Sequence, residues 1–527
     1  MNGMRKRSGK LIGWLTAILL AVLLGSCAKW EAPSKEPPTP DAKPGYEKEV
    51  KLVGYLIGEA PAGMPEVLKV LNDKLKRDIN ATLELNYVGW GDLASRYPLV
   101  LESGEQVDFI FAADWNFYVA EAVRGAFMPL DKHLLSEYMP RHMSKMPEEA
   151  WRASLVNGQI YMIPTSSPDR KVNVALFRKD VMKSAGMSKI GKFSEIEPYL
   201  AEIKDHYPGM IPLNLDAQFD LTTPYQYLLN EKIAWSGAPF DSGEPLAQGI
   251  TSDAENPSGE LWSMVEEPML SVQKYATGIM KDWYDKGYVN RNPFANKDRS
   301  KNTFCDGKSG VAFGNSYDMV STFALCMERG IDVYPFPMLF PSGHAAEASW
   351  LNNGVAIGAG ARHPERALAA LDLIMQEPSY VYLTYFGIEG KHYVMTEDGE
   401  IGLPDGVTPE TNTYPPDAAG FWFVNKDLFK PMKMWTESYV ILKEKIDGYL
   451  IPTTYQGFLF NSNNVKTEIA NLKNVSKQYA QPIYFGAVDN VDMAFETLTA
   501  HLKTAGIDKV KAEVEQQAAV FLANKDR

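Results

Sequence analysis

Short apolar runs alternate with helical periodicity in the chain from residue 50 onward. Residues 50–57 form an apolar run typical of a strand, and from 64 to 79 apolar residues recur at the spacing of one helical face. Further strands are predicted at 83–88 and 107–112, and Asp114 is expected to cap the helix that follows the latter. Strands that alternate with helices predict a layered α/β fold with mostly parallel strands.

The same alternation continues later in the chain. Strands are predicted at 172–177, 310–313 and 354–357, and a helix with one apolar face is predicted at 364–375. The stretch 235–260 is rich in Gly, Pro, Ser and Asp, which is typical of a surface loop.

A basic stretch and an apolar run of 14 residues, 11–24, precede Cys27. The run is shorter than the roughly 20 apolar residues that a spanning helix needs, which favours a signal peptide over residues 1–26. The ending Leu24-Gly25-Ser26-Cys27 resembles the bacterial lipobox, and this resemblance implies cleavage before Cys27 and lipidation of Cys27, with palmitate among the acyl groups. An ordinary secreted protein with a chance cysteine, or an uncleaved anchor, are the alternatives.

Composition indicates a globular protein, because 45% of the residues are hydrophobic and 23% are charged. The net charge is −13, and loss of the signal, which carries four basic residues and no acids, would leave −17. This charge argues against nucleic-acid binding, which needs a basic surface. Residues 27–49, rich in Pro, Lys and Glu, are predicted to form a flexible tether behind the lipidated cysteine.

Few residues point to cofactor chemistry. Cys305 and Cys326 are equally compatible with a disulfide and with two buried thiols. No zinc-ligand spacing occurs, and Phe193 replaces the Ser or Thr that a phosphate-binding loop at 186–192 would need. We therefore expect no cofactor and no metal.

Six segments carry a family resemblance through their order along the chain: 107–134, 157–166, 173–187, 307–318, 349–375 and 385–395. Together they resemble the extracellular solute-binding lipoproteins of ABC importers, in the branch that carries oligosaccharides. A tail from about residue 450 resembles a C-terminal domain of unknown function found in a subgroup of these lipoproteins.

The resemblance implies a two-lobed, type II periplasmic-binding-protein-like fold with a ligand cleft between the lobes. It places the first lobe at 50–165 and 354–450, the second at 166–353, and a C-terminal family-specific region at 451–527. It also implies delivery of a carbohydrate to ABC permease subunits from the outer face of the bacterial cytoplasmic membrane. We expect a monomer and no catalytic activity.

Sugar recognition needs aromatic rings against the apolar faces of the sugar and planar polar groups for its hydroxyls. Such side chains that follow strands are the best candidates, since ligands of open α/β sheets collect there. The predicted ligand-binding residues, some of them chosen through the resemblance, are Trp90, Asp114, Trp115, Asn315, Tyr317, Trp350, Asn352, Glu389 and Tyr393.

Two other functions stay open from the sequence alone. A secreted glycan-degrading enzyme needs two facing carboxylates, and 66 acidic residues offer many such pairs without distinguishing one. A peptide-binding protein of an ABC importer would use a similar cleft.

Overall fold

The computed structural model describes residues 46–166, 168–217, 219–235 and 249–525. Residues 48–527 form one folded unit, distinct from residues 1–47. The predicted signal peptide, Cys27 and the tether up to residue 45 lie outside the described residues. In the described part of the chain, no helix is long and apolar enough to cross a membrane.

A five-stranded sheet, in the order β2-β1-β3-β13-β6, organises the first lobe. The predicted first strand is confirmed as β1 (Val50–Ile57), which pairs in parallel with β2 (Ala81–Val88) and β3 (Phe109–Ala112). β13 (Gly354–Ala356) pairs antiparallel with both β3 and β6 (Met162–Ile163). The prediction of mostly parallel strands is therefore wrong beyond β3. The reason is that the chain leaves for the second lobe after β6 and returns through β13 in the opposite direction.

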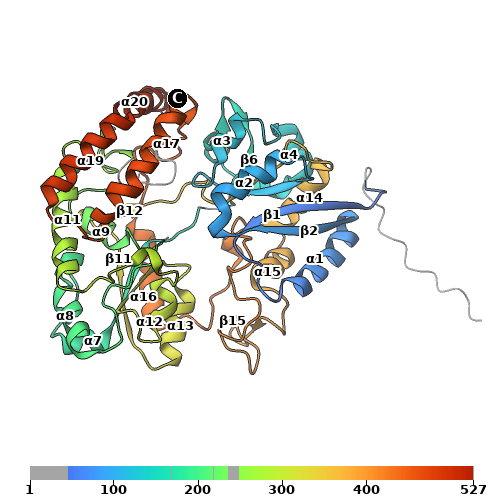
Figure 1. The fold of residues 1–527 in the computed structure, drawn as a ribbon. Helices are drawn as coiled ribbons and strands as arrows, with labels where there is room; N and C mark the ends of the chain where they lie inside the picture. The colour runs from blue at the N-terminus through green and yellow to red at the C-terminus, as the bar shows by residue number, and fades with distance from the viewer. Residues whose placement is uncertain (1–45, 167, 218, 236–248, 526–527) are drawn as a thin grey trace, which may run out of the picture. The chain divides into compact units, whose positions relative to one another are not determined.

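The predicted helix at 364–375 is confirmed as α14 (Pro364–Gln376). Every residue from Arg366 to Gln376 is buried, however, and not one face alone, because α14 packs against α1, α4, α5 and α15 at once (Figure 1). The other helices and short strands of this lobe are α1 (Met64–Ile79), α2 (Leu93–Glu102), α3 (Tyr118–Val123), α4 (Lys132–Tyr138), α5 (Pro140–Lys145), α6 (Glu148–Ala153), α15 (Pro378–Phe386), β4 (Leu155–Val156), β5 (Gln159–Ile160), β14 (Val394–Met395) and β15 (Ile401–Gly402).

A three-stranded antiparallel sheet organises the second lobe, with β7 (Asn173–Arg178) between β10 (Val311–Asn315) and β11 (Val333–Pro337). The surface loop predicted at 235–260 is described only from residue 249, where β8 (Ile250–Thr251) is buried and paired with β9 (Trp262–Ser263). The helices around this sheet are α7 (Lys179–Ser184), α8 (Glu197–His206), α9 (Thr223–Asn230), α11 (Met269–Asp285), α12 (Ser300–Phe304) and α13 (Val320–Glu328).

Helix α16 (Glu437–Tyr449) packs against β11 and α13 and so lies with the second lobe. Its buried Tyr439, Leu442 and Ile446 join the core that covers β7. β16 (Leu450–Ile451), which follows α16, pairs with β12 (Ala345–Ala346) of the same lobe. From the sequence, residues up to 450 were expected to lie in the first lobe. Because the apolar face of α16 packs in the second lobe, the chain enters that lobe before α16.

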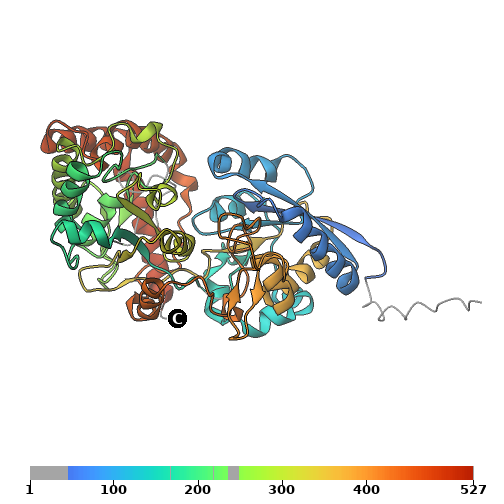
Figure 2. The same cartoon turned by 90° about the horizontal axis from the view of Figure 1, so that it is seen from below.

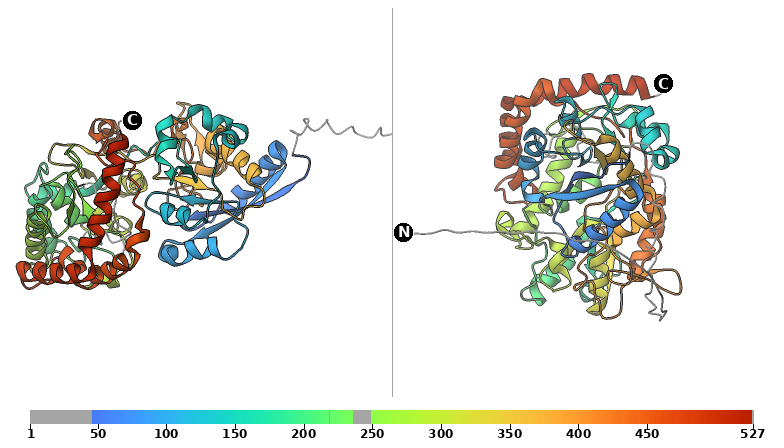
Figure 3. Two further views of the ribbon diagram at one scale, coloured as in Figure 1. Left: turned by 90° about the horizontal axis from the view of Figure 1, so that it is seen from above. Right: turned by 90° about the vertical axis from the view of Figure 1, so that its right-hand side faces the viewer.

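The C-terminal region adds helices α17 (Lys466–Val475), α18 (Gln481–Tyr484), α19 (Val491–Ala505) and α20 (Ile507–Lys525) to the second lobe. Their apolar residues belong to one core with those of α9 and α11, and α19 lies beside α11 (Figure 2). Gly506 ends α19 with φ of +101°, a conformation that favours glycine, so that α20 leaves in a different direction (Figure 3).

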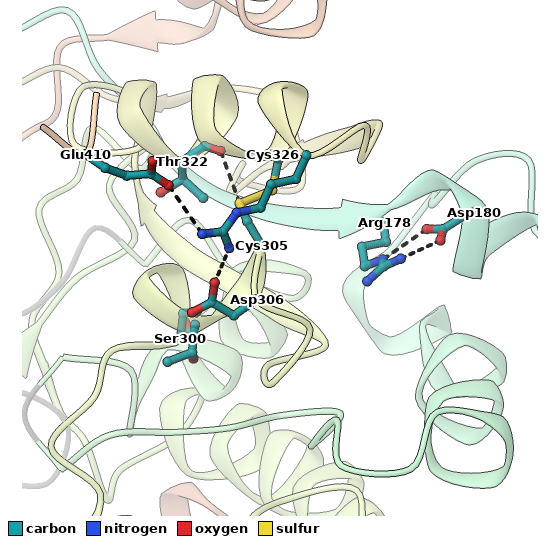
Figure 4. The surroundings of a disulfide bond; sticks show 10 residues. Arg178, Asp180, Ser300, Cys305, Asp306, Thr322, Cys326 and Glu410 are labelled. Carbon is teal, nitrogen blue, oxygen red and sulfur yellow. Dashed lines mark hydrogen bonds and ion pairs between the residues drawn. A yellow bond between two sulfur atoms is a disulfide. The ribbon is translucent and has the colours of Figure 1, made fainter. Parts of the chain in front are cut away.

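A disulfide joins Cys305, just after α12, to Cys326 in α13, and both cysteines are buried (Figure 4). The structure thus decides between the two alternatives that the sequence left open. A disulfide of this kind is typical of proteins that fold outside the reducing cytosol.

Reduction of this disulfide should lower the free energy of unfolding by about 3 kcal/mol, because the bond closes a loop of 21 residues in the unfolded chain. Urea unfolding with and without a thiol reductant measures the change. A Cys305→Ala, Cys326→Ala variant serves as the control, since its stability should not respond to the reductant. Equal stability of the oxidised and reduced wild-type protein would contradict the prediction.

Candidate ligand-binding site

Within the described residues, three segments pass between the two lobes. The first, 164–172, joins β6 to β7; the second, 347–353, joins β12 to β13; and the third, 425–436, leads from the first lobe into α16. Contacts that hold these three segments together therefore also determine how the two lobes are arranged.

The carboxylate of Asp169 contacts all three crossing segments. Lys171 Nζ donates to Oδ2 at 2.7 Å, and Asn353 Nδ2 and Asn352 Nδ2 donate to the same oxygen at 2.8 and 3.1 Å. Lys426 Nζ donates to Oδ1. Asp169 is buried, so these contacts take the place of water around its carboxylate.

Asp169 stays ionised in this position. Burial by itself would raise its pKa, but the ammonium groups of Lys426 and Lys171 outweigh burial and hold the pKa well below its usual range. The carboxylate is therefore a fixed negative charge where the crossing segments converge.

Four aromatic rings lie close together near the second crossing segment, where Trp115 is hydrogen-bonded to Asn352. Trp90 stacks on Trp115 and on Trp422, with ring centroids 6.0 and 5.6 Å apart. Phe219, from the second lobe, meets Trp90 edge-to-face at 6.4 Å. Although large and apolar, Trp90, Trp115 and Phe219 expose 36%, 48% and 38% of their surface. We call these four residues the aromatic cluster; exposed aromatic surface of this kind marks a binding site.

The first lobe supplies three of these rings from the carboxyl ends of its strands and from a neighbouring loop. Trp90 begins a short turn after β2, and Trp115 follows β3. Trp115 Nε1 donates to the carbonyl oxygen of Asn352 at 2.7 Å, and Trp422 Nε1 donates to that of Asp417 at 2.8 Å. The polar edge of each of these two indoles is thus held by backbone, and Trp115 still exposes 48% of its surface.

The second lobe supplies Phe219 and a set of charged groups beside it. The Arg299 guanidinium lies 4.6 Å from the centre of the Phe219 ring and donates to Asp318 Oδ2 at 3.2 Å. Lys301 Nζ lies 3.3 Å from the same oxygen. In the described part of the chain, Arg299 Nε and Asp318 Oδ1 are buried without a hydrogen-bond partner. The second lobe thus places two cationic side chains and a carboxylate beside Phe219.

Three acidic side chains near the rings have raised pKa values, chiefly because protein surrounds them. Burial raises the pKa of Asp417 to about 6 and that of Asp220 to about 6. Burial of its carboxyl also raises the pKa of Asp114, although the residue as a whole is exposed. Asp114 and Asp417 combine an enclosed carboxyl with an accessible residue surface, which indicates a concave surface, whereas Asp220 is buried.

A cavity of about 630 Å³ lies next to the cluster, on the side of Asp417 and Tyr317. Tyr385 donates a hydrogen bond of 3.0 Å to Asp417 Oδ1, and Lys426 Nζ lies 5.5 Å from the Tyr317 ring centre. Trp435 also lines this cavity. The cavity therefore joins residues of both lobes with the last crossing segment.

The predicted site residues divide into those near the cluster and those elsewhere. Trp90 and Trp115 stack directly, and Asn352 positions Trp115 through its carbonyl oxygen. The expectation that Asp114 caps a helix is wrong, because α3 begins only at Tyr118, after a tight turn, and Phe117 precedes it. The Asp114 carboxyl therefore does not cap a helix and remains available to a ligand in the cleft.

The other predicted residues have varied surroundings. Asn315 accepts hydrogen bonds from the backbone N–H groups of residues 317 and 318, so it shapes the turn that carries Tyr317. Trp350 lines a different cavity, described below. Tyr393 is buried against the rings of Tyr382 and Phe386, and Glu389 is an exposed loop residue; their contact with ligand stays a prediction.

Sequence reasoning missed Phe219, Trp422, Arg299, Asp417 and Asp169. Trp422 stands in the run Phe-Trp-Phe at 421–423, which is typical of core, and Phe219 follows no predicted strand. Asp216 and Asp220 lie on either side of Phe219, and these two turn-forming residues were the signal in the sequence that Phe219 stands in a turn.

Nothing in the described ranges suggests a metal centre, since no group of three or more His, Cys, Asp or Glu side chains is placed to hold an ion.

Two sheets in two lobes, three crossing segments and aromatic rings from both lobes define a solute-binding protein of the type II architecture. The chain belongs to the family of bacterial extracellular solute-binding proteins, whose family model matches residues 62–378. A second model, for a domain of unknown function (DUF3502), matches residues 454–523, which contain helices α17 to α19 and most of α20.

Similar proteins share the arrangement over nearly the whole chain. A carbohydrate ABC transporter substrate-binding protein of Streptococcus pneumoniae serotype 4 (strain ATCC BAA-334 / TIGR4) is 23% identical over 526 residues, 97% of each chain. The crystal structure of the N-glycan transport solute binding protein NgtS from Streptococcus pneumoniae matches with a TM-score of 0.71 and 21% identity, over 90% of this chain and 100% of that one. The alginate-binding protein AlgQ2 matches with a TM-score of 0.64 and 18% identity, over 90% and 98% of the two chains. These structures have the same fold.

Replacement of Asp169 by Ala should lower the free energy of unfolding by about 3 kcal/mol, because it leaves two ammonium groups and two amides without their buried partner. Asp447→Ala is the matched control. Asp447 pairs with the neighbouring Arg170, but both side chains are exposed, so its loss should cost under about 1 kcal/mol. Urea unfolding of both variants makes the comparison, and equal small losses would show that the Asp169 contacts do not stabilise the fold.

Proposed function

We propose that this protein binds an oligosaccharide between its lobes and delivers it to the permease subunits of an ABC importer. The observation that carries the proposal is the aromatic cluster, in which rings from both lobes meet and remain partly exposed. Aromatic faces cover the apolar C–H surfaces of sugars, and the neighbouring Asp114, Tyr317 and Arg299 can exchange hydrogen bonds with hydroxyl groups.

The relatives support a carbohydrate ligand. The pneumococcal relative is named a carbohydrate ABC transporter substrate-binding protein. NgtS has been crystallised with Man1GlcNAc and with Man5GlcNAc, and FusA of S. pneumoniae with kestose. Because these ligands differ in chemistry, they support the class of ligand and leave its identity to a binding screen.

Closure of the lobes around the ligand is the step that allows a transporter to recognise the loaded protein. A ligand that contacts Trp90 in one lobe and Phe219 in the other stabilises the closed arrangement by its differential affinity. The closed form then presents one surface to the permease, and the ligand leaves chemically unchanged.

A screen of Man1GlcNAc, Man5GlcNAc, kestose, fructo-nystose, alginate oligosaccharides and short peptides tests the proposal by calorimetry. We expect binding to one carbohydrate class, a smaller radius of gyration in small-angle scattering, and recovery of the intact sugar. Binding to peptides alone would favour the peptide-binding alternative. Cleaved sugar, abolished by one Asp or Glu substitution, would favour the hydrolase.

Trp90→Ala and Phe219→Ala should each weaken binding of that carbohydrate by about 1–3 kcal/mol, on the scale of truncating an aromatic anchor. Phe294→Ala is the control, because Phe294 is another half-exposed phenylalanine, 47% accessible, that packs against Phe485 away from the aromatic cluster. Calorimetry gives the affinities and thermal unfolding verifies the fold. Unchanged affinity of both cluster variants would place the ligand elsewhere.

We also propose that the protein is held at the outer face of the cytoplasmic membrane by acyl chains on Cys27, as its lipobox-like sequence indicates. In the native bacterium, Cys27→Ala should release the protein into the medium or leave an unprocessed precursor. Cell fractionation and N-terminal sequencing distinguish these outcomes. A variant that stays on the membrane with a normally trimmed N-terminus would contradict the lipid anchor.

A further inference from the structure

The C-terminal helices form one wall of a large cavity that the aromatic cluster does not occupy. The cavity has a volume of about 1,100 Å³. Its lining includes Val520 and Phe521 of α20, Arg152 and Leu155 of the first lobe, and Trp350 from the second crossing segment. The cavity therefore brings together both lobes and the domain of unknown function.

Its size and lining suit a carbohydrate. Pockets for single small ligands usually measure about 300–1,000 Å³, so this cavity has room for more than one sugar ring. Trp350 and Phe521 offer partly exposed aromatic rings, while Glu149 and Gln516 offer planar polar groups. This combination of rings and planar polar groups is the one that sugar recognition requires.

The second crossing segment connects this cavity to the aromatic cluster. Ser349 and Trp350 line the cavity, and the carbonyl oxygen of Leu351, the next residue along the chain, accepts a hydrogen bond of 2.9 Å from the backbone N–H of Asp114, the residue before Trp115. One residue further along, the carbonyl oxygen of Asn352 accepts the hydrogen bond of Trp115 Nε1. Ser349 and Trp350, which line the cavity, are thus only two or three residues from Asn352, which holds Trp115 of the aromatic cluster.

We propose that this cavity is a second carbohydrate subsite, which takes the outer residues of a long oligosaccharide whose other end lies on the aromatic cluster. The role of the C-terminal domain is then to build the far wall of this subsite. The inference rests on the proposed carbohydrate-binding function and adds a preference for chain length to it.

The position of α20 explains why such a wall would matter. A ligand in the cavity contacts the first lobe through the segment around Leu155 and the second lobe through α20, which is packed into the core of that lobe. Each additional sugar residue bound there favours closure further, because it too contacts both lobes. Affinity should therefore rise with the length of the glycan.

The test compares a short and a long member of the carbohydrate class that the wild-type protein binds: Man1GlcNAc with Man5GlcNAc, kestose with fructo-nystose, or a short with a long alginate oligosaccharide. Val520→Arg and Leu155→Arg each place a long charged side chain into the cavity, one from each lobe, at residues that are 60% and 40% exposed. Met493→Arg on α19 is the matched control: Met493 is 65% exposed and not among the residues that line the cavity.

We expect the wild-type protein and Met493→Arg to bind the long glycan at least tenfold more tightly than the short one. Both cavity variants should lose this advantage while their affinity for the short glycan stays within about twofold of wild type. An equal affinity of the wild-type protein for both lengths, or a retained length advantage in both folded cavity variants, would overturn the subsite and leave the aromatic cluster as the binding site. Binding of no carbohydrate at all would overturn the proposed function itself, so the two failures are distinguishable.

Discussion

The carboxylate of Asp169 is the contact on which the relation between the two lobes depends. It holds Lys171 of its own crossing segment, Asn352 and Asn353 of the second, and Lys426 of the third. A buried ion pair of this type adds little stability compared with well-packed apolar side chains, although loss of one partner is costly. Its larger effect is on geometry, because a carboxylate with four donors is satisfied in few arrangements of the three segments. The aromatic cluster depends on that geometry, since Asn352 touches Asp169 through its amide and Trp115 through its carbonyl group.

The architecture could be predicted from sequence wherever one segment determines its own structure. β1 and α14 follow from apolar runs and helical spacing and were found within a residue of their predicted bounds. Strand direction was not predictable in the same way, because β13 and β6 acquire their antiparallel pairing from a chain that has crossed to another lobe and returned. The complete burial of α14 also depends on distant helices, and local periodicity cannot report it.

The candidate site could be predicted only in part for the same reason. Trp90 and Trp115 follow strands, and the rule that ligands collect at strand ends was enough to select them. Phe219 and Trp422 come to the cluster from loops more than a hundred residues further along the chain than Trp90 and Trp115, so nothing local distinguishes them from core aromatics. Asp169 was missed because its partners lie in three separate segments, and a lone aspartate before Arg170 and Lys171 looks like part of a solvated charged stretch.

The second lobe also shows why the C-terminal domain cannot be regarded as an addition to a finished protein. The central sheet of this lobe has three strands only, too few to cover a lobe of this size, and the apolar side chains of α9 and α11 need further partners. Leu472, Ile483, Phe495 and Leu502 of the C-terminal helices supply them and are buried in the same core. A truncation before residue 454 would therefore expose that core and remove a wall of the cavity at once, which would confuse stability with binding. Single substitutions at exposed positions of α20 leave the core intact, and for this reason only they can separate the contribution of the domain to folding from its contribution to the ligand.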